Sequence, residues 1–396
     1  MDDAGRTRRL LVINSGLLGA HTFGIRLLPA VAAHTRELDI EQVMLAETFT
    51  FGERVMRRVI CQRCWTDRWP GWQNLDLARY RMEMHAGLVA ARRLRRRPRN
   101  RHDALLFYRT PAAYASLALM RRVPSIVAID STQACIQEEL TSPFERASLV
   151  PNVRRDGRVF NAARLVLASS RWAADSLREM YPTCRTSVEV LPPLVDLDAF
   201  PPGWIAERTA RAASGERPRM LFVGGEFPRK GGFDLLQAWR EAGLGANAAL
   251  DVVTGWPLDA RDLPPGVTLH RGVAAYSDRR RELWRASDVF VMPTRHEAFG
   301  QVYLEAAAAG LPRIGTREHA IPEVIADGET GFLVDPGDRQ ALIARLCALA
   351  TQPELRMSLG TAARKWAMRE ASPQRYARVL ESAVRQVLAP AGAAVP

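Results

Sequence analysis

The sequence predicts an α/β protein built from two Rossmann-like domains that face each other across a cleft. Short apolar strands alternate with helical segments in at least seven units, and no short fixed period relates them. The units form two groups, and a proline-rich connection at residues 192–203 separates the groups. A chain of 396 residues is also too long for one ordinary core, so two domains of similar size are expected.

The first half of the chain predicts a parallel sheet with helices on both faces. Its strands are short apolar runs, and its helices have apolar stripes with cap residues such as Ser169 and Ser170. Residues 50–73 combine tryptophan, cysteine and arginine without a clear period and are left unassigned. The expected strands are 9–14, 42–46, 104–108, 125–129, 165–168 and 188–191, and the expected helices are 25–35, 75–94, 112–120, 144–163 and 171–180.

Loops at the carboxyl ends of these strands are candidates for ligand contact, because ligands of open parallel sheets bind at that edge. Gly16 and Gly19 follow the first strand, and neither has a side chain to obstruct a close ligand. Asp130 directly follows an apolar strand. Glycines in such loops often serve the turn alone, so these residues are weak candidates taken singly.

The second half restarts the same alternation of strands and helices. We expect the segment 327–338 to form a hairpin-like loop and a last helix to span residues 373–388. The expected strands are 219–223, 250–253, 267–270, 289–292 and 312–315, and the other expected helices begin near 233, 279, 301, 322 and 339.

The loop after the strand at 219–223 reads GGEFPRKGG and predicts an anion-binding element. Gly224 and Gly225 form a turn, Arg229 and Lys230 add positive charge, and a helix begins directly afterwards. Lysine is otherwise used only at position 365, so Lys230 stands out among 55 basic residues. An isolated pair of basic residues is usually solvated. The strand, the glycine turn and the helix start together favour a functional role.

The segment 289–310, VFVMPTRHEAFGQVYLEAAAAG, is the most informative part of the chain. A buried strand leads into a loop with Glu297, which turns at Phe299 and Gly300 into an apolar helix carrying Glu305. Either glutamate alone would be read as a surface acid or an acid favoured at a helix N-terminus. The helix is largely apolar, however, so Glu305 is expected to be shielded from water and to need a partner.

These two elements supply what a nucleotide-sugar requires. Arg229, Lys230 and the backbone amides at Phe299, Gly300 and Gln301 suit a diphosphate, whose charge is stabilised best by fixed donors in a dry cleft. Glu305 is placed to accept hydrogen bonds from ribose hydroxyls, and Glu297 is placed to contact the sugar. The candidate loops contain no DxD-type segment, in keeping with the expectation that no metal or other cofactor is needed.

The run HEAFGQVYLEAAAAGLPRIGTREHAIPEVIADGETGFLVDPGD resembles the signature of the large family of retaining GT-B glycosyltransferases, with the E-x7-E motif at Glu297 and Glu305. FVGGEFPRKGG and SSRWAADSLREMY extend the similarity, which covers most of residues 165–345. The resemblance implies a GT-B fold with an acceptor domain at 1–195, a donor domain at 196–372 and a C-terminal segment, 373–396, that packs its helix on the first domain and ends in a flexible tail. By position, Lys230, Gly16, Gly19 and Glu305 inherit donor binding, and Glu297 inherits contact with the transferred sugar. Lys230 and Glu297, on neighbouring loops, are the candidate catalytic residues, and Asp130 is the candidate on the acceptor side.

Two positions depart from the family pattern. Gly225 stands where many members place an arginine, which leaves Arg229 as a substitute, and Asp130 stands where a histidine often ends the strand of the first domain. The implied reaction is transfer with retention of anomeric configuration, in the synthesis of a glycan, glycolipid or polysaccharide. The leaving diphosphate is expected to help deprotonate the acceptor hydroxyl. An epimerase or phosphorylase of the same fold is the nearest alternative.

Composition narrows the cellular setting. The apolar runs are too short for a membrane span or a signal peptide, which favours the cytoplasm, and five scattered cysteines predict reduced thiols. Cys61 and Cys64 form one CxxC, too little for a confident zinc site. The net charge is +12, and the arginine-rich segment 92–101 suggests contact with an anionic membrane at its inner face. An inactive protein that binds anionic surfaces is a second alternative; no nucleic-acid partner is expected.

Overall fold

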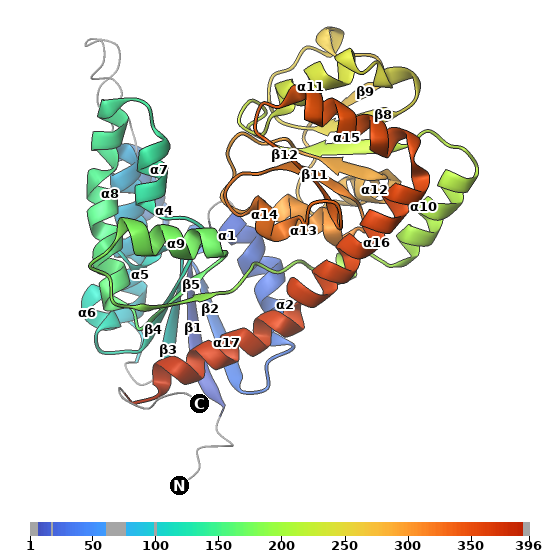
Figure 1. The fold of residues 1–396 in the computed structure, drawn as a ribbon. Helices are drawn as coiled ribbons and strands as arrows, with labels where there is room; N and C mark the ends of the chain where they lie inside the picture. The colour runs from blue at the N-terminus through green and yellow to red at the C-terminus, as the bar shows by residue number, and fades with distance from the viewer. Residues whose placement is uncertain (1–6, 17–18, 61–76, 99–100, 391–396) are drawn as a thin grey trace. The chain divides into compact units, whose positions relative to one another are not determined.

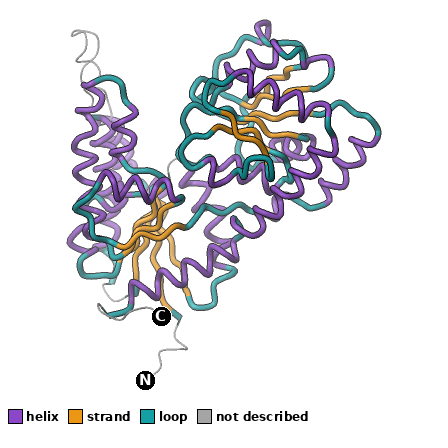
Figure 2. Tube along the Cα trace, in the orientation of Figure 1, coloured by secondary structure: helices purple, strands orange, loops and turns teal. Residues whose placement is uncertain are grey.

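The computed structural model describes residues 7–16, 19–60, 77–98 and 101–390. The chain divides into two compact units, one formed by residues up to 192 together with those from 373 onward and one formed by residues 193–372. Among the described residues, each unit contains an open six-stranded parallel sheet covered by helices (Figures 1 and 2). The predicted α/β class with two Rossmann-like sheets is confirmed.

The sheet of the first unit has the strand order β2-β1-β3-β4-β5-β6, with parallel neighbours throughout. The interior strands are buried on both faces, which explains their unbroken apolar sequences. The chain passes from β1 to the edge strand β2 and then returns to β3 on the other side of β1, so the sheet switches direction between β1 and β3. The strands are β1 (Arg8–Asn14), β2 (Leu38–Met44), β3 (Ala104–Tyr108), β4 (Ser125–Ile129), β5 (Leu165–Ala168) and β6 (Ser187–Val190).

The helices of the first unit include the last helix of the chain. Arg385 in this helix pairs with Glu37 at 2.8 Å, and the backbone N–H of Arg36 donates to Glu381 at 2.7 Å. The helices are α1 (Gly19–Thr22), a π-helical turn (Phe23–Leu27), α2 (Leu28–Ala32), α3 (Leu45–Thr48), α4 (Phe51–Ile60), α5 (Ala78–Arg95), a 3-10 turn (Thr110–Ala113), α6 (Leu117–Met120), α7 (Gln133–Glu139), α8 (Pro143–Ala162), α9 (Arg171–Met180) and α17 (Pro373–Leu388).

The sheet of the second unit has the order β12-β11-β10-β7-β8-β9, again with parallel neighbours. The strands are β7 (Arg219–Val223), β8 (Ala249–Val253), β9 (Val267–His270), β10 (Val289–Val291), β11 (Arg313–Thr316) and β12 (Gly331–Val334). The longer helices are α10 (Gly203–Ala213), α11 (Gly232–Glu241), α12 (Asp278–Ala286), α13 (Gln301–Ala308), α15 (Arg339–Thr351) and α16 (Pro353–Glu370). Single turns occur at Leu197–Ala199, Leu244–Ala246, Ala260–Asp262 and α14 (Ile321–Val324).

Several element predictions were wrong in detail. The expected hairpin-like loop contains β12, which pairs with β11 in parallel, because its four buried residues complete the edge of the sheet. The strand expected at 42–46 begins at Leu38 and gives way to α3 at Leu45. Helices α4, α7, α10 and α16 were not predicted, and α4 lies in the stretch 50–73 that shows no clear period.

The CxxC stretch and the question of a membrane span complete the comparison of sequence and structure. Cys61, Cys64 and the rest of the stretch 61–73 lie outside the described residues. In the part of the chain that the structure describes, no helix combines the length and the apolar character that crossing a bilayer requires.

A buried carboxyl group lies inside the first unit, on α8. Asp156 is 1% exposed and accepts hydrogen bonds from the Tyr114 hydroxyl at 2.9 Å and the Gln133 N–H at 3.2 Å. The pKa of Asp156 is raised to about 7, chiefly by burial and also by the neighbouring Glu83, whereas the hydrogen bonds oppose the shift. The folded protein therefore retains a proton that the unfolded chain releases at lower pH.

Replacing Asp156 should remove this pH dependence. Between pH about 4 and about 7 the native state binds more protons at this site than the unfolded state, so wild-type stability should fall as the pH rises through that window. Asp156→Asn has no proton to release, and its free energy of unfolding should fall less steeply, by up to roughly 1 kcal/mol per pH unit. Urea unfolding at a series of pH values measures both slopes. If the free energies of unfolding of the wild type and of Asp156→Asn changed with pH in the same way, the raised pKa of Asp156 would be contradicted.

Candidate functional site

The switch point of the second sheet lies between β7 and β10. The chain continues from β7 to β8 and β9 on one side and then returns to β10, β11 and β12 on the other. Because β7 and β10 are parallel neighbours, the loops that follow them leave the same edge of the sheet. Lys230 lies in the first loop and Glu297 in the second, so the fold brings together two segments that are far apart in sequence.

A glycine allows the two loops to touch. Gly231 has a left-handed backbone with φ of 72°, and a Cβ built there would lie 1.8 Å from the carbonyl oxygen of Pro293. A side chain at this position would therefore collide with backbone of the neighbouring loop as well as strain its own conformation. The preceding turn is closed by the Lys230 N–H, which donates to the Glu226 carbonyl at 2.9 Å.

Hydrogen bonds fix the loops against each other. The carbonyl of Arg229 accepts from the Arg295 N–H at 2.9 Å and from the Thr294 hydroxyl at 3.1 Å. The Arg229 guanidinium donates back to the His296 carbonyl at 2.7 Å. Thr316, at the end of β11, donates its hydroxyl to the Thr294 carbonyl at 2.8 Å. The loop geometry is thus set by hydrogen bonds that the backbone carbonyls of the two loops accept.

Lys230 and Glu297 form an ion pair at the meeting point of the loops. Their side chains are 14% and 15% exposed, respectively. The stem of Lys230 passes close to Gly224, where an added Cβ would lie 3.1 Å from the Lys230 Cγ. The two residues that sequence analysis selected for catalysis are therefore in direct contact.

The charge of Lys230 depends on its surroundings. Burial lowers the pKa of its ammonium below the ordinary value, and the nearby Arg229 lowers it further, whereas the carboxylate of Glu226 raises it. The carboxylate of Glu297 also favours the charged form, because it touches the ammonium. An ammonium in this position requires an anionic partner, either Glu297 or an anion that displaces it.

Helix α13 begins at the end of the second loop. Gly300 precedes it with φ of 80°, and a Cβ there would lie 2.6 Å from the ring of Tyr303. No side chain caps the first turn of α13, so its amide groups remain available for an anion. Phe299 is buried, and the Gln301 side chain donates to the Leu194 carbonyl at 2.8 Å, which leaves the backbone of Gln301 as its contribution to the site.

Glu305 lies in α13 and is buried, as the apolar helix suggested. It is 5% exposed, and the Arg280 guanidinium donates to its carboxylate at 2.9 Å. Arg280 was not predicted, because it is one of three successive arginines at 279–281 and nothing in the sequence distinguishes it. Only the structure shows that the second arginine of α12 reaches Glu305, so that Glu305 is held as an ion pair with one partner.

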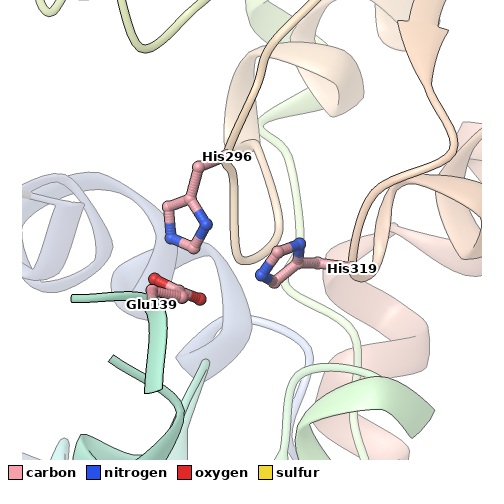
Figure 3. Close-up of side chains that lie close together, drawn as sticks. All are labelled: Glu139, His296 and His319. Carbon is pink, nitrogen blue, oxygen red and sulfur yellow. The ribbon is translucent and has the colours of Figure 1, made fainter. Parts of the chain in front are cut away.

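Two histidines flank the same edge of the sheet. His296 precedes Glu297, and His319 follows β11; their rings meet edge to face at 4.5 Å between centroids (Figure 3). His319 has a positive φ of 50°, and its Nδ1 lies 2.7 Å from the Glu318 carboxylate. Neither histidine was selected from the sequence. The sequence signals that could have selected them are the position of His296 next to Glu297 and the position of His319 shortly after the strand that became β11.

The remaining predicted residues belong to the first unit. Gly16 follows β1 with φ of 70°, and its N–H donates to the Asn14 side chain at 2.9 Å; Gly19 begins α1. Asp130 follows β4 and accepts from Arg109 at 2.5 Å. Arg109 has φ of 76°, an uncommon conformation for a residue with a side chain, and Asp130 raises the pKa of its guanidinium.

The geometry of the second unit suits a ligand that carries both a negatively charged group and hydroxyl groups. Lys230, the guanidinium of Arg229 and the free amides at the start of α13 supply positive charge at one edge of the sheet. The partly shielded Glu297 and the buried Glu305 supply acceptors for hydroxyl groups nearby. Gly225, in contrast, is exposed and has no neighbour where its Cβ would be, so it leaves space at the mouth of the loop.

Comparisons with known proteins point to one family. Residues 217–352 match the family described as glycosyl transferases group 1. A D-inositol 3-phosphate glycosyltransferase of an Arthrobacter species is 30% identical over 299 residues, covering 71% of this chain and 70% of the relative. A GDP-mannose-dependent alpha-(1-6)-phosphatidylinositol monomannoside mannosyltransferase of Mycolicibacterium smegmatis is 32% identical over 53% of this chain and 59% of the relative. The chain thus spans less than two thirds of some relatives that it matches.

Solved structures share the fold at low sequence identity. A sucrose-phosphate synthase from Thermosynechococcus elongatus superimposes with a TM-score of 0.69, 17% identity and coverage of 96% of this chain and 99% of the other. WaaG, a glycosyltransferase involved in lipopolysaccharide biosynthesis, gives a TM-score of 0.62 with 18% identity over 94% of this chain and 99% of the other. At these identities the likeness establishes the GT-B fold alone.

Two glycines of one loop should respond differently to alanine. Gly231→Ala places a methyl group against the Pro293 carbonyl and forces a left-handed backbone on a residue that disfavours it. We expect it to lower the free energy of unfolding by about 2–4 kcal/mol. Gly225→Ala meets open space and should change stability by less than about 1 kcal/mol. Denaturant unfolding of both variants measures the contrast, and equal losses would contradict the close approach of the two loops.

Proposed function

The chain belongs to the group 1 glycosyltransferase family, and on this premise we propose that it transfers a sugar from a nucleotide-diphosphate sugar to an acceptor hydroxyl with retention of anomeric configuration. The observation that carries the proposal is the largely shielded ion pair of Lys230 and Glu297 at the switch point of the second sheet. Lys230 is suited to the phosphate end of the donor bond that breaks, and Glu297 is suited to its sugar end.

The donor is held by the second unit in this proposal. Lys230, Arg229 and the amides from Phe299 to Gln301 bind the diphosphate, and Glu305 accepts hydrogen bonds from the ribose. Arg280 is a positioning residue, since its guanidinium fixes one oxygen of Glu305 and leaves the other for a hydroxyl. Gly16 and Gly19, which carry no side chains themselves, contact the same donor in this proposal.

The transfer needs charge stabilisation at the leaving group. As the bond between the anomeric carbon and the phosphate oxygen breaks, negative charge grows on the diphosphate, and Lys230 leaves Glu297 to neutralise it. Glu297 is then free to accept a hydrogen bond from the sugar. The acceptor oxygen attacks the same face of the anomeric carbon, and its proton passes to the departing phosphate, so the configuration is retained. We assign no protein side chain as a nucleophile.

The acceptor side of the proposal rests on the first unit. Asp130, paired with the strained Arg109 at the end of β3, is placed to contact a polar acceptor. Relatives named for D-inositol 3-phosphate and for phosphatidylinositol monomannoside support an acceptor of the inositol or glycolipid class. We therefore propose a peripheral protein that works at the cytoplasmic face of a membrane.

Removing Lys230 should abolish turnover without unfolding the protein. Loss of one charge-stabilising donor in a dry site typically costs roughly 10²–10³-fold in kcat. Lys365→Met is the matched control, because it is the other lysine of the chain and lies exposed on α16. Release of nucleoside diphosphate from UDP-glucose, GDP-mannose and ADP-glucose, with an inositol phosphate as acceptor, measures the effect of Lys230→Met. Full activity in Lys230→Met would refute the assigned site.

Neutralising Glu305 should act mainly on donor binding. Glu305→Gln keeps the shape of the side chain but loses a charged hydrogen bond to the ribose and the ion pair with Arg280, so the KM for the donor should rise by roughly tenfold or more. Glu282→Gln changes an exposed acid on α12 and should leave the KM unaltered. Steady-state kinetics distinguish the two variants. Conversion of the donor to an epimer without transfer would instead support an epimerase.

A further inference from the structure

Helix α4 in the first unit is amphipathic, but its apolar side faces solvent (Figure 1 labels the helix). Phe51 is 76% exposed, Val55 46%, Met56 55% and Val59 61%. No residue of α4 is buried. A helix on the surface of a globular protein normally turns its apolar stripe toward the core, so α4 is oriented in reverse.

The exposed residues form one continuous face. Phe51, Val55 and Val59 follow each other at intervals of four residues and therefore stack along one side of the helix, and Met56 extends that side. Gly52 lies between them and adds no polar group. A contiguous apolar surface of this kind usually marks a contact site.

Contacts on the opposite side hold α4 in this orientation. Glu53 pairs with Arg93 of α5 at 2.9 Å, and Arg57 lies over the ring of Phe49 at 5.7 Å. The start of the helix is a capping box, in which the Glu53 carboxylate accepts from the Thr50 N–H at 2.9 Å and the Thr50 hydroxyl accepts from the Glu53 N–H at 3.3 Å. The polar residues thus fix the helix, and the apolar ones are left outward.

The charges around the apolar face are positive. Arg54 and Arg58 are exposed along one edge of it. Glu53 is the single carboxylate of α4, and it faces inward with its charge balanced by Arg92 and Arg93. A second copy of the chain would bring no carboxylate of α4 to neutralise these arginines, whereas an anionic bilayer offers both negative headgroups and an apolar layer.

We propose that α4 is a membrane-docking helix that lies in the headgroup region of an anionic bilayer. Phe51, Val55, Met56 and Val59 enter the boundary of the acyl layer, and Arg54 and Arg58 bind lipid phosphates. In the arginine-rich segment 92–101, Arg92 and Arg93 pair with Glu53, and Arg97 and Arg101 pair with Glu41, whereas Arg95 and Arg96 are exposed and can add to the contact made by α4. The inference extends the proposed action on lipid-linked acceptors by naming the surface that meets the lipid.

Vesicle co-sedimentation of the full chain tests the proposal without donor or acceptor. The protein should bind phosphatidylcholine vesicles that contain phosphatidylglycerol and bind pure phosphatidylcholine vesicles much more weakly. Met56→Gln should weaken binding by roughly tenfold, because it removes an inserted apolar side chain. Met368→Gln should leave binding unchanged, since Met368 is equally exposed, at 54%, but lies on α16 in the second unit. Arg54→Gln and Arg58→Gln should each weaken binding by about fivefold.

Three results would overturn the proposal. They are failure of the wild-type protein to bind anionic vesicles, equal effects of Met56→Gln and Met368→Gln, and self-association in solution that Met56→Gln abolishes while vesicle binding is absent. Sugar transfer to a soluble inositol phosphate gives a separate readout, because residues of α4 take no part in donor binding. Loss of vesicle binding in Met56→Gln with transfer retained would support docking, and absence of transfer in a vesicle-binding wild type would refute only the proposed function.

Discussion

The parallel pairing of β7 with β10 is the constraint on which the candidate site depends. These strands are separated by two complete strand and helix units, and their pairing sets the loops after them side by side. The Lys230 and Glu297 ion pair exists because of this arrangement. An apolar strand such as β10, fully buried between β7 and β11, is held in register by its neighbours, so the site inherits the rigidity of the sheet center.

The cost of a buried basic residue explains how this site is built. Removing the Lys230 ammonium from water is unfavourable, and without a ligand Glu297 offsets that cost by direct contact. A diphosphate offers more negative charge than one carboxylate, so exchange of partners favours donor binding and releases Glu297 toward the sugar. Glu305 has a different arrangement, because Arg280 stays with it and fixes its orientation. The ion pair of Lys230 and Glu297 therefore exchanges its carboxylate for the diphosphate, whereas the ion pair of Arg280 and Glu305 persists and orients Glu305.

The sequence was sufficient to predict the fold class, most strands and the family, since buried parallel strands are short apolar runs and the E-x7-E segment is long and specific. It also selected Lys230 and Glu297 as partners on neighbouring loops. It did not predict Arg280, because three adjacent arginines on a helix differ only in the direction that each side chain takes. Helix α4 was missed altogether, because residues 50–73 show no clear period. The side that it turns toward the protein depends on Glu53 and Arg57 meeting α5 and Phe49. The edge strand β12 was missed because glycine and acidic residues surround its four apolar residues.

Calorimetric titration of the wild-type protein with UDP, GDP and ADP, each beside its monophosphate and its nucleoside, tests the central claim most directly. If Lys230, Arg229 and the start of α13 form a diphosphate site, one of these diphosphates binds at least roughly tenfold more tightly than its own monophosphate, because the β-phosphate gains charge-assisted hydrogen bonds. Equal affinity of the diphosphate, the monophosphate and the nucleoside, or no binding of any diphosphate to the folded protein, would contradict the account.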